Sequence, residues 1–168
     1  MRAASIIALS AALLLAGAAQ AAEPAPPALQ FVFEEEVALA AAIPAGKTAY
    51  GERNIIPITG GTFAGPEMKG TIIPGGWDWQ LRRADGCLDV KADYMLRTDD
   101  GVIINVVNTG VICRPQDGKA APIRTHPRFE APLGKYAWLG QMAFVGTLEP
   151  MTGADGKPGV RIRFYKAM

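Results

Sequence analysis

The sequence is poor in the residues that most often carry catalytic or metal chemistry. Its only serines are Ser5 and Ser10, near the start of the chain, and its only histidine is His126. With one histidine and two cysteines, a transition-metal site is not expected. The chain also lacks a phosphate-binding loop and a dinucleotide-binding fingerprint. We therefore expect no metal and no cofactor.

Residues 1–21 have the pattern of a secretory signal peptide. A short basic start at Arg2 precedes an uncharged apolar run over residues 6–15, and residues 19–21, AQA, match the small-x-small cleavage pattern. The run is too short to span a bilayer comfortably. We expect cleavage after Ala21, a periplasmic or secreted protein, and no membrane span after cleavage. Both serines leave with this segment, which excludes a serine nucleophile.

The chain that follows residue 21 carries no excess charge. Loss of Arg2 leaves 16 basic and 16 acidic residues, so the protein lacks the electrostatic attraction that nucleic acids and anionic membranes require. Neither is expected as a partner. Residues 22–29 are rich in proline and are expected to form an extended linker, which leaves residues 30–168 as one domain. Whether this domain forms a homo-oligomer stays open.

The domain sequence has the patterns of β-strands. In residues 87–97, CLDVKADYMLR, apolar and charged residues alternate. The turn signal TDDG at 98–101 leads into a returning strand over 102–113. Residues 31–41, FVFEEEVALAA, fit either a strand or a helix, and we favour a strand. Nineteen glycines and 13 prolines suit many turns. We expect an all-β fold, a single antiparallel β-barrel of about eight or more strands.

The register of this hairpin bears on the two cysteines. With a three-residue loop at Asp99–Gly101, Cys87 faces Cys113, within the distance that a disulfide requires. An exported chain meets oxidising conditions, so we favour a disulfide. The alternative is two free thiols, because a two-residue loop would shift the register by one.

The same register makes Tyr94 and Asn108 diagonal neighbours on an otherwise apolar face. Two interpretations have equal standing. A few polar groups on an apolar barrel interior are typical of a small-ligand site. A hydrogen-bonded Tyr–Asn pair inside a packed core fits equally well.

The segment PRFE at 127–130 concentrates charge beside an aromatic ring. In an extended chain Arg128 and Glu130 share one side and Phe129 takes the other. Arg128 could orient an acidic group of a ligand, with Phe129 adding contact surface. Glu130 could serve as a general acid or base. The alternative is an ion pair that ties the loop.

Asp78 is a second candidate for acid/base chemistry. Alternation places Trp77 and Trp79 on one face of an extended segment and the Asp78 carboxylate on the other. The carboxylate either points into a pocket or accepts hydrogen bonds from backbone amides of a turn at Gly75–Gly76. We favour the second interpretation slightly.

The aromatic segment KYAWLGQMAFVG, at 135–146, completes the candidates. A strand there puts Tyr136, Trp138, Met142 and Phe144 on one face. Such a face belongs to a core more often than to a ligand site. Trp138, near the charged PRFE segment, is the member most suited to contact a ligand.

The chain resembles a known family from about Phe31 to Tyr165. The motifs that carry the resemblance, in this order, are GGTFAGPEMKG (60–70), PGGWDWQ (74–80), DYMLRTDDG (93–101), NTG (108–110), PRFEAP (127–132) and KYAWLGQMAFVG (135–146). The family is the domain of unknown function 3237, also called uncharacterised protein family 0311. The resemblance implies a small antiparallel β-barrel and no assigned activity.

Three functions remain open at this point. The first is an exported barrel that binds a small, partly apolar molecule with or without an acidic group. The second is a structural or interaction module of the cell envelope with a filled barrel. The third is an acid/base isomerase, lyase or cyclase that uses Asp78 or Glu130.

Overall fold

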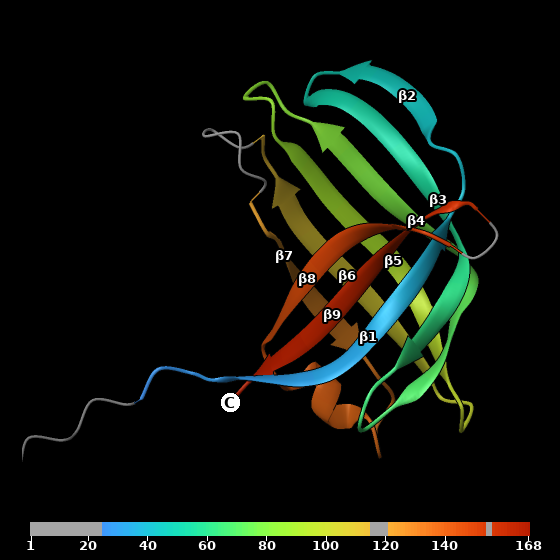
Figure 1. Ribbon diagram of the computed structural model, residues 1–168, viewed down its shortest axis with the longest axis vertical. Helices are drawn as coiled ribbons and strands as arrows, with labels where there is room; N and C mark the ends of the chain where they lie inside the picture. The colour runs from blue at the N-terminus through green and yellow to red at the C-terminus, as the bar shows by residue number, and fades with distance from the viewer. Residues whose placement is uncertain (1–24, 115–120, 154–155) are drawn as a thin grey trace, which may run out of the picture.

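The computed structural model describes residues 25–114, 121–153 and 156–168 and shows an antiparallel β-barrel (Figure 1). Eight of the nine strands in these ranges close the barrel, and one strand is additional. The predicted fold class is therefore confirmed. The predicted signal peptide, residues 1–21, and the first residues of the predicted linker lie outside the described residues.

From β2 to β9, each strand pairs with the next one along the chain, whereas β1 does not pair with β2. The strands are β1 (Leu29–Leu39), β2 (Ile43–Thr48), β3 (Gly51–Ala64), β4 (Lys69–Arg82), β5 (Leu88–Thr98), β6 (Ile103–Ile112), β7 (Ile123–Glu130), β8 (Phe144–Thr152) and β9 (Pro158–Ala167). β1 pairs with β9 on one side and with β3 on the other, which closes the barrel. β2 pairs with the first part of β3 and lies outside the closed ring.

The β5–β6 hairpin has the register predicted from the sequence. Leu88 pairs with Ile112 and Tyr94 with Val106. Cys87 and Cys113, just beyond the paired residues, form a disulfide with their Cα atoms 4.2 Å apart. The hairpin loop and the alternation of apolar residues were thus sufficient to place residues 26 positions apart in contact.

One half of the barrel interior is filled by phenylalanine rings, which we call the phenylalanine cluster. Phe33 lies 5.0 Å from Phe164 and 5.9 Å from Phe129, measured between ring centroids. Phe129 in turn lies 4.8 Å from Phe144, and Phe63 contacts Phe33 from β3. The rings meet edge-on or tilted, which is the arrangement that aromatic quadrupoles favour. Interdigitated rings leave this half of the barrel closed.

A short helix lies below this filled end, where we had expected extended chain. Residues Ala137–Gly140 form the 3-10 helix η1, visible at the lower end of the barrel in Figure 1. A 3-10 helix aligns side chains three positions apart, so Tyr136 and Leu139 are both buried against the barrel. The expected common strand face of Tyr136, Trp138, Met142 and Phe144 is therefore wrong.

Residues 31–39 of the segment 31–41 lie in β1, so the strand favoured from the sequence is confirmed, although it begins at Leu29, inside the predicted linker, and ends at Leu39. In the described parts of the chain, we find no helix of sufficient length and hydrophobicity to traverse a bilayer.

Candidate functional site

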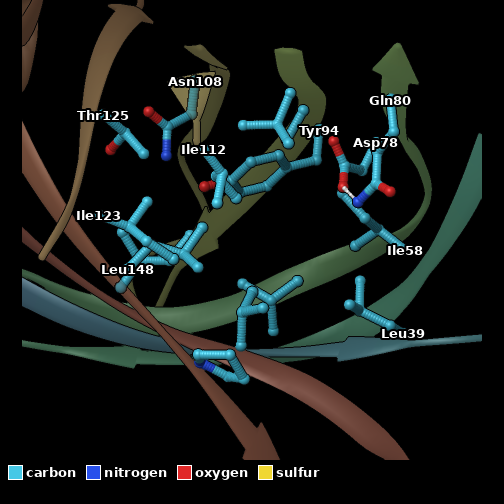
Figure 2. Close-up of a pocket in the computed structure, with 16 residues that line it drawn as sticks. Leu39, Ile58, Asp78, Gln80, Tyr94, Asn108, Ile112, Ile123, Thr125 and Leu148 are labelled. Atoms are coloured by element: carbon cyan, nitrogen blue, oxygen red, sulfur yellow. Dashed lines mark hydrogen bonds between the residues drawn. The ribbon is translucent and has the colours of Figure 1, made fainter. Parts of the chain in front are cut away.

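The half of the barrel opposite the phenylalanine cluster contains a cavity of about 290 Å³. Eleven of its 16 lining side chains are apolar, and they come from β1 and from β3 through β9. The polar lining residues are Asp78, Gln80, Tyr94, Asn108 and Thr125. Figure 2 shows Asn108 and Thr125 on one side of the cavity and Asp78 and Gln80 on the other, with the Tyr94 ring between them. No lysine, arginine or histidine is among these described lining residues.

Asp78 reaches the cavity because β4 alternates as predicted. Trp77 and Trp79 are each 41% exposed on the outer face, and Asp78 points inward. Gly75 and Gly76 lie within β4, so the slightly favoured interpretation, a carboxylate that satisfies a glycine turn, is wrong. The register of β4 against β5 shifts by two positions between Ile73 and Trp77, so buried Ile72 and Asp78 keep the same parity.

The Asp78 carboxylate is only partly satisfied. Gln80 Nε2 donates a hydrogen bond to Oδ2 at 2.8 Å, and buried Oδ1 has no hydrogen-bond partner among the described residues. Burial raises the pKa of Asp78, against the opposing effects of Gln80 and of the nearby Lys91 backbone amide. The Lys91 amide lowers the pKa of Asp78 but makes no hydrogen bond to Oδ1. The cavity therefore presents a carboxylate oxygen that can accept a further hydrogen bond.

A second carboxyl group, Glu35, lies inside the barrel and was missed from the sequence. Its side chain is fully buried, and the Tyr94 hydroxyl donates a hydrogen bond to its Oε1. Burial raises the pKa of Glu35 to about 8, and the bond from Tyr94 opposes this shift. Burial therefore favours the neutral form of Glu35. Burial and the neighbouring Glu35 raise the pKa of Tyr94 as well.

A signal for Glu35 was present in the strand period. Glu35 has the same parity as Phe33, Val37 and Leu39, which face the interior. The run of three glutamates obscured this parity, because charged residues on both sides of Glu35 make the whole run look exposed. Glu34 and Glu36 are the outward members and form ion pairs with Arg161 and Arg163.

Asn108 and Thr125 add unused hydrogen-bonding groups to the cavity wall. Asn108 Oδ1 and Thr125 Oγ1 are buried without partners among the described residues. Ala92 pairs with Asn108, so Asn108 is diagonal to Tyr94 as predicted. Tyr94 nevertheless bonds to Glu35, so the interpretation in which Tyr94 and Asn108 satisfy each other in a packed core does not describe the structure.

The other residues predicted for the site lie away from the cavity. Phe129 points inward from β7 but belongs to the phenylalanine cluster. Arg128 and Glu130 share a side, as predicted, and because Phe129 faces inward that side is the solvent-exposed outer face. Trp138 lies in η1, 6.2 Å from the Phe144 ring and 4.9 Å from Lys166 Nζ. Of the residues predicted from sequence, the structure brings Asp78, Tyr94 and Asn108 together.

Among the described residues, Arg128 and Glu130 form no ion pair with each other. The alternative in which such a pair holds the loop is therefore also not seen. Within the same residues, no group of three or more histidine, cysteine, aspartate and glutamate side chains is placed to hold a metal ion.

Comparison with known proteins identifies relatives that match most of this chain. The family described as protein of unknown function (DUF3237) matches residues 27–167. A UPF0311 protein of Rhodopseudomonas palustris is 35% identical over 130 residues, which cover 70% of this chain and 85% of the relative. A β-barrel-like protein from Acinetobacter baumannii, known from a crystal structure, matches with a TM-score of 0.77 and 32% identity, over 87% of this chain and 99% of that one.

One further relative has a named activity. The hydroalkoxylation enzyme phnH of Penicillium herquei is 31% identical over 124 residues, which cover 74% of this chain and 76% of the relative.

Proposed function

The chain belongs to the DUF3237 family of proteins of unknown function, and on that premise we propose that its barrel cavity binds a small, mostly apolar molecule that carries a hydroxyl group. The observation that supports this proposal is the apolar cavity of about 290 Å³ with a buried, unpartnered oxygen of Asp78 in its wall. Ligand pockets commonly combine an apolar lining with a few polar groups that fix orientation. A buried polar atom without a partner is costly, and a ligand hydroxyl would satisfy it.

The charges at the site favour a neutral ligand over an acidic one. Arg128, which could have oriented an acidic group, lies on the outer face, and the described cavity lining contains no cation. A ligand carboxylate would meet the Asp78 carboxylate in an apolar setting, where like charges repel strongly. A hydroxyl group avoids this repulsion and donates to the same oxygen.

Binding of 1-naphthol and naphthalene, two molecules that differ by one hydroxyl group, tests the proposal. Wild-type protein should bind both at neutral pH and prefer 1-naphthol by roughly tenfold, the worth of a hydrogen bond to a charged acceptor. Asp78→Leu should lose this preference and retain naphthalene. Fluorescence titration of 1-naphthol and its displacement by naphthalene measure both affinities.

Two further variants separate the cavity from the protein surface. Ala92→Phe fills the cavity from β5 and should abolish binding of both probes. Arg128→Ala changes only the outer face and should leave both affinities unchanged. Failure of wild-type protein to bind either probe, or binding that survives Ala92→Phe in a folded variant, would overturn the proposal.

A second candidate function is acid/base catalysis in the same cavity. Two observations favour it: the relative named as a hydroalkoxylation enzyme and the buried Asp78, whose pKa is raised. Hydroalkoxylation adds an O–H group across a C=C bond. In the step we propose, the acid form of Asp78 gives its proton to one alkene carbon as the hydroxyl oxygen bonds to the other carbon. The Asp78 carboxylate then takes the hydroxyl proton, which restores its acid form. A carboxylate with a raised pKa suits both transfers. Glu130, exposed on the outer face, has no part in this step.

An alkenyl phenol tests this second function. 2-(3-Methylbut-2-enyl)phenol should cyclise to an isomer of the same mass, separable by chromatography, and Asp78→Asn should reduce the rate by at least about 100-fold. Arg128→Ala and Glu130→Gln, both on the outer face, should keep the wild-type rate. A rate unchanged by Asp78→Asn would contradict the role of Asp78.

A structural module with a filled barrel is the competing function. The cavity argues for a ligand-binding barrel, because a purely structural module would gain stability from a filled interior.

We also propose export to the periplasm or the exterior. The signal-like residues 1–21 and the Cys87–Cys113 disulfide support it. Fractionation of host cells, with N-terminal sequencing, should place a chain beginning at Ala22 outside the cytoplasm. An uncleaved cytoplasmic chain would contradict export.

A further inference from the structure

We propose that the cavity recognises a carbonyl oxygen through Tyr94, and that buried Glu35 controls whether the Tyr94 hydroxyl is free to donate. This inference rests on the proposed binding function and deepens it. The ligand class becomes a small apolar ketone, or a hydroxy-ketone whose hydroxyl group meets Asp78. Glu35 acts through Tyr94 and is a positioning residue.

The contacts of Tyr94 place it between the cavity and Glu35. Its side chain lines the cavity from β5, and its hydroxyl bonds Glu35 Oε1 on β1, 59 residues away in sequence. Glu35 itself does not line the cavity, and its Oε2 is buried without a partner among the described residues. A ligand therefore reaches Glu35 only through the Tyr94 hydroxyl.

The protonation of Glu35 sets the direction of this hydrogen bond. A tyrosine hydroxyl has one proton to donate, and a carboxylate only accepts hydrogen bonds. An ionised Glu35 therefore binds the single Tyr94 proton. A neutral Glu35 can instead donate its own proton to Tyr94 Oη, which frees the Tyr94 proton for a carbonyl oxygen in the cavity. Burial favours the neutral form.

The surroundings of Glu35 leave Tyr94 as its immediate titratable partner. Glu35 pairs with Phe63 on β3 and with Ile162 on β9, neither of which carries charge. Asp78 on β4 is the acidic residue of the described cavity wall and accepts a hydrogen bond from Gln80. The flanking charges on the barrel, Arg161 and Arg163 with Glu34 and Glu36, pair with one another on the outer face.

A ketone and its hydrocarbon counterpart provide the test. 1-Tetralone and tetralin have the same bicyclic frame, and neither titrates between pH 6 and 9.5. At pH 6, wild-type protein should prefer 1-tetralone by roughly three- to tenfold, the worth of one neutral hydrogen bond. At pH 9.5 the preference should disappear, because ionised Glu35 then holds the Tyr94 proton. Isothermal titration calorimetry at several pH values measures the ratio of the two affinities.

Three variants identify the groups responsible. Tyr94→Phe should remove the ketone preference at every pH. Glu35→Gln should keep the preference at both pH 6 and pH 9.5, because an amide donates to Tyr94 Oη without titrating. Asp78→Leu should retain the pH dependence of the wild type, which separates the effect of Glu35 from that of the carboxyl group that lines the cavity.

The outcomes distinguish this inference from the proposed function. Equal binding of 1-tetralone and tetralin at every pH would overturn the role of Tyr94 and leave cavity binding intact. A pH-dependent preference that persists in Glu35→Gln would overturn the role of Glu35. Binding of neither probe at any pH would overturn the binding function itself.

Discussion

The Tyr94 hydroxyl and Glu35 Oε1 form a hydrogen bond inside the barrel, between strands β5 and β1. This bond joins two groups whose charged forms are both disfavoured by burial. It also links the hairpin that carries the disulfide to the strand that closes the barrel. The pair therefore connects two distant strands through the barrel interior.

Stability should fall as pH rises from about 4.5 to about 8. The pKa of Glu35 is about 8 in the folded protein and near its ordinary value of 4.5 in the unfolded chain. Between these values the folded state binds the extra proton, so each unit of pH costs stability. The total loss is on the order of 5 kcal/mol. Urea denaturation at pH 5, 7 and 9 measures it.

Glu35→Gln is the matched variant for this prediction, because it removes the titrating group and keeps its shape. Its free energy of unfolding should change much less between pH 5 and pH 9. Glu36→Gln, one position along β1 and exposed, should retain the wild-type slope. A wild-type stability that rises over this pH range would contradict a buried neutral Glu35.

Removal of the disulfide should destabilise the barrel without unfolding it. The double variant Cys87→Ser, Cys113→Ser opens a covalent loop spanning 26 positions of sequence. The chain-entropy account predicts a loss of roughly 3–4 kcal/mol, measurable by urea denaturation against the oxidised wild type. Thiol titration of unfolded, unreduced wild-type protein should find no reactive thiol; two reactive thiols would refute the pairing.

Gly146→Ala should disturb the cavity wall. A Cβ atom at Gly146 would lie 2.1 Å from Thr125 Oγ1 and 3.3 Å from the Phe164 ring. Relief of this overlap requires the buried Thr125 side chain to rotate or β7 and β8 to move apart, which we expect to cost about 1–3 kcal/mol. Gly140→Ala is the control, because its nearest contact would be an ordinary 3.5 Å. Thermal denaturation of the two variants should rank Gly146→Ala well below Gly140→Ala.

Phe129→Ala should act on stability and not on ligand selection. Phe129 packs against Phe33, Phe144 and Phe164 in the filled half of the barrel. Its truncation should cost about 3–5 kcal/mol. Arg128→Ala, one residue earlier and exposed, should stay within about 0.5 kcal/mol of wild type. A Phe129→Ala variant of wild-type stability with lost naphthalene binding would instead assign Phe129 to the ligand site.

Local patterns predicted the parts of this fold that depend on neighbours in sequence. Alternation and one turn signal were enough to place Cys87 against Cys113 and Tyr94 diagonal to Asn108. Alternation also predicted that Asp78 and the flanking indoles take opposite faces. It could not say which face is interior, because that depends on how distant strands close the barrel.

The missed features depend on such distant contacts. Arg128 and Glu130 share a side as predicted, but the position of Phe129 in a cluster from several strands makes that side exterior. Glu35 is buried because closure of β1 against β3 and β9 covers it and brings Tyr94 within reach. The η1 helix forms because Tyr136 and Leu139 pack against the end of the barrel. The alternation of residues in a strand carries no information about this packing.

The two halves of the barrel differ in packing, and this difference bears on how sequences with this fold can change. The phenylalanine cluster holds one half together, and the cavity occupies the other. Substitutions at the cavity end change the shape of the cavity while the phenylalanine cluster continues to hold the barrel together. Proteins with the same architecture are therefore free to acquire different ligands, and a shared fold within the family does not imply a shared substrate.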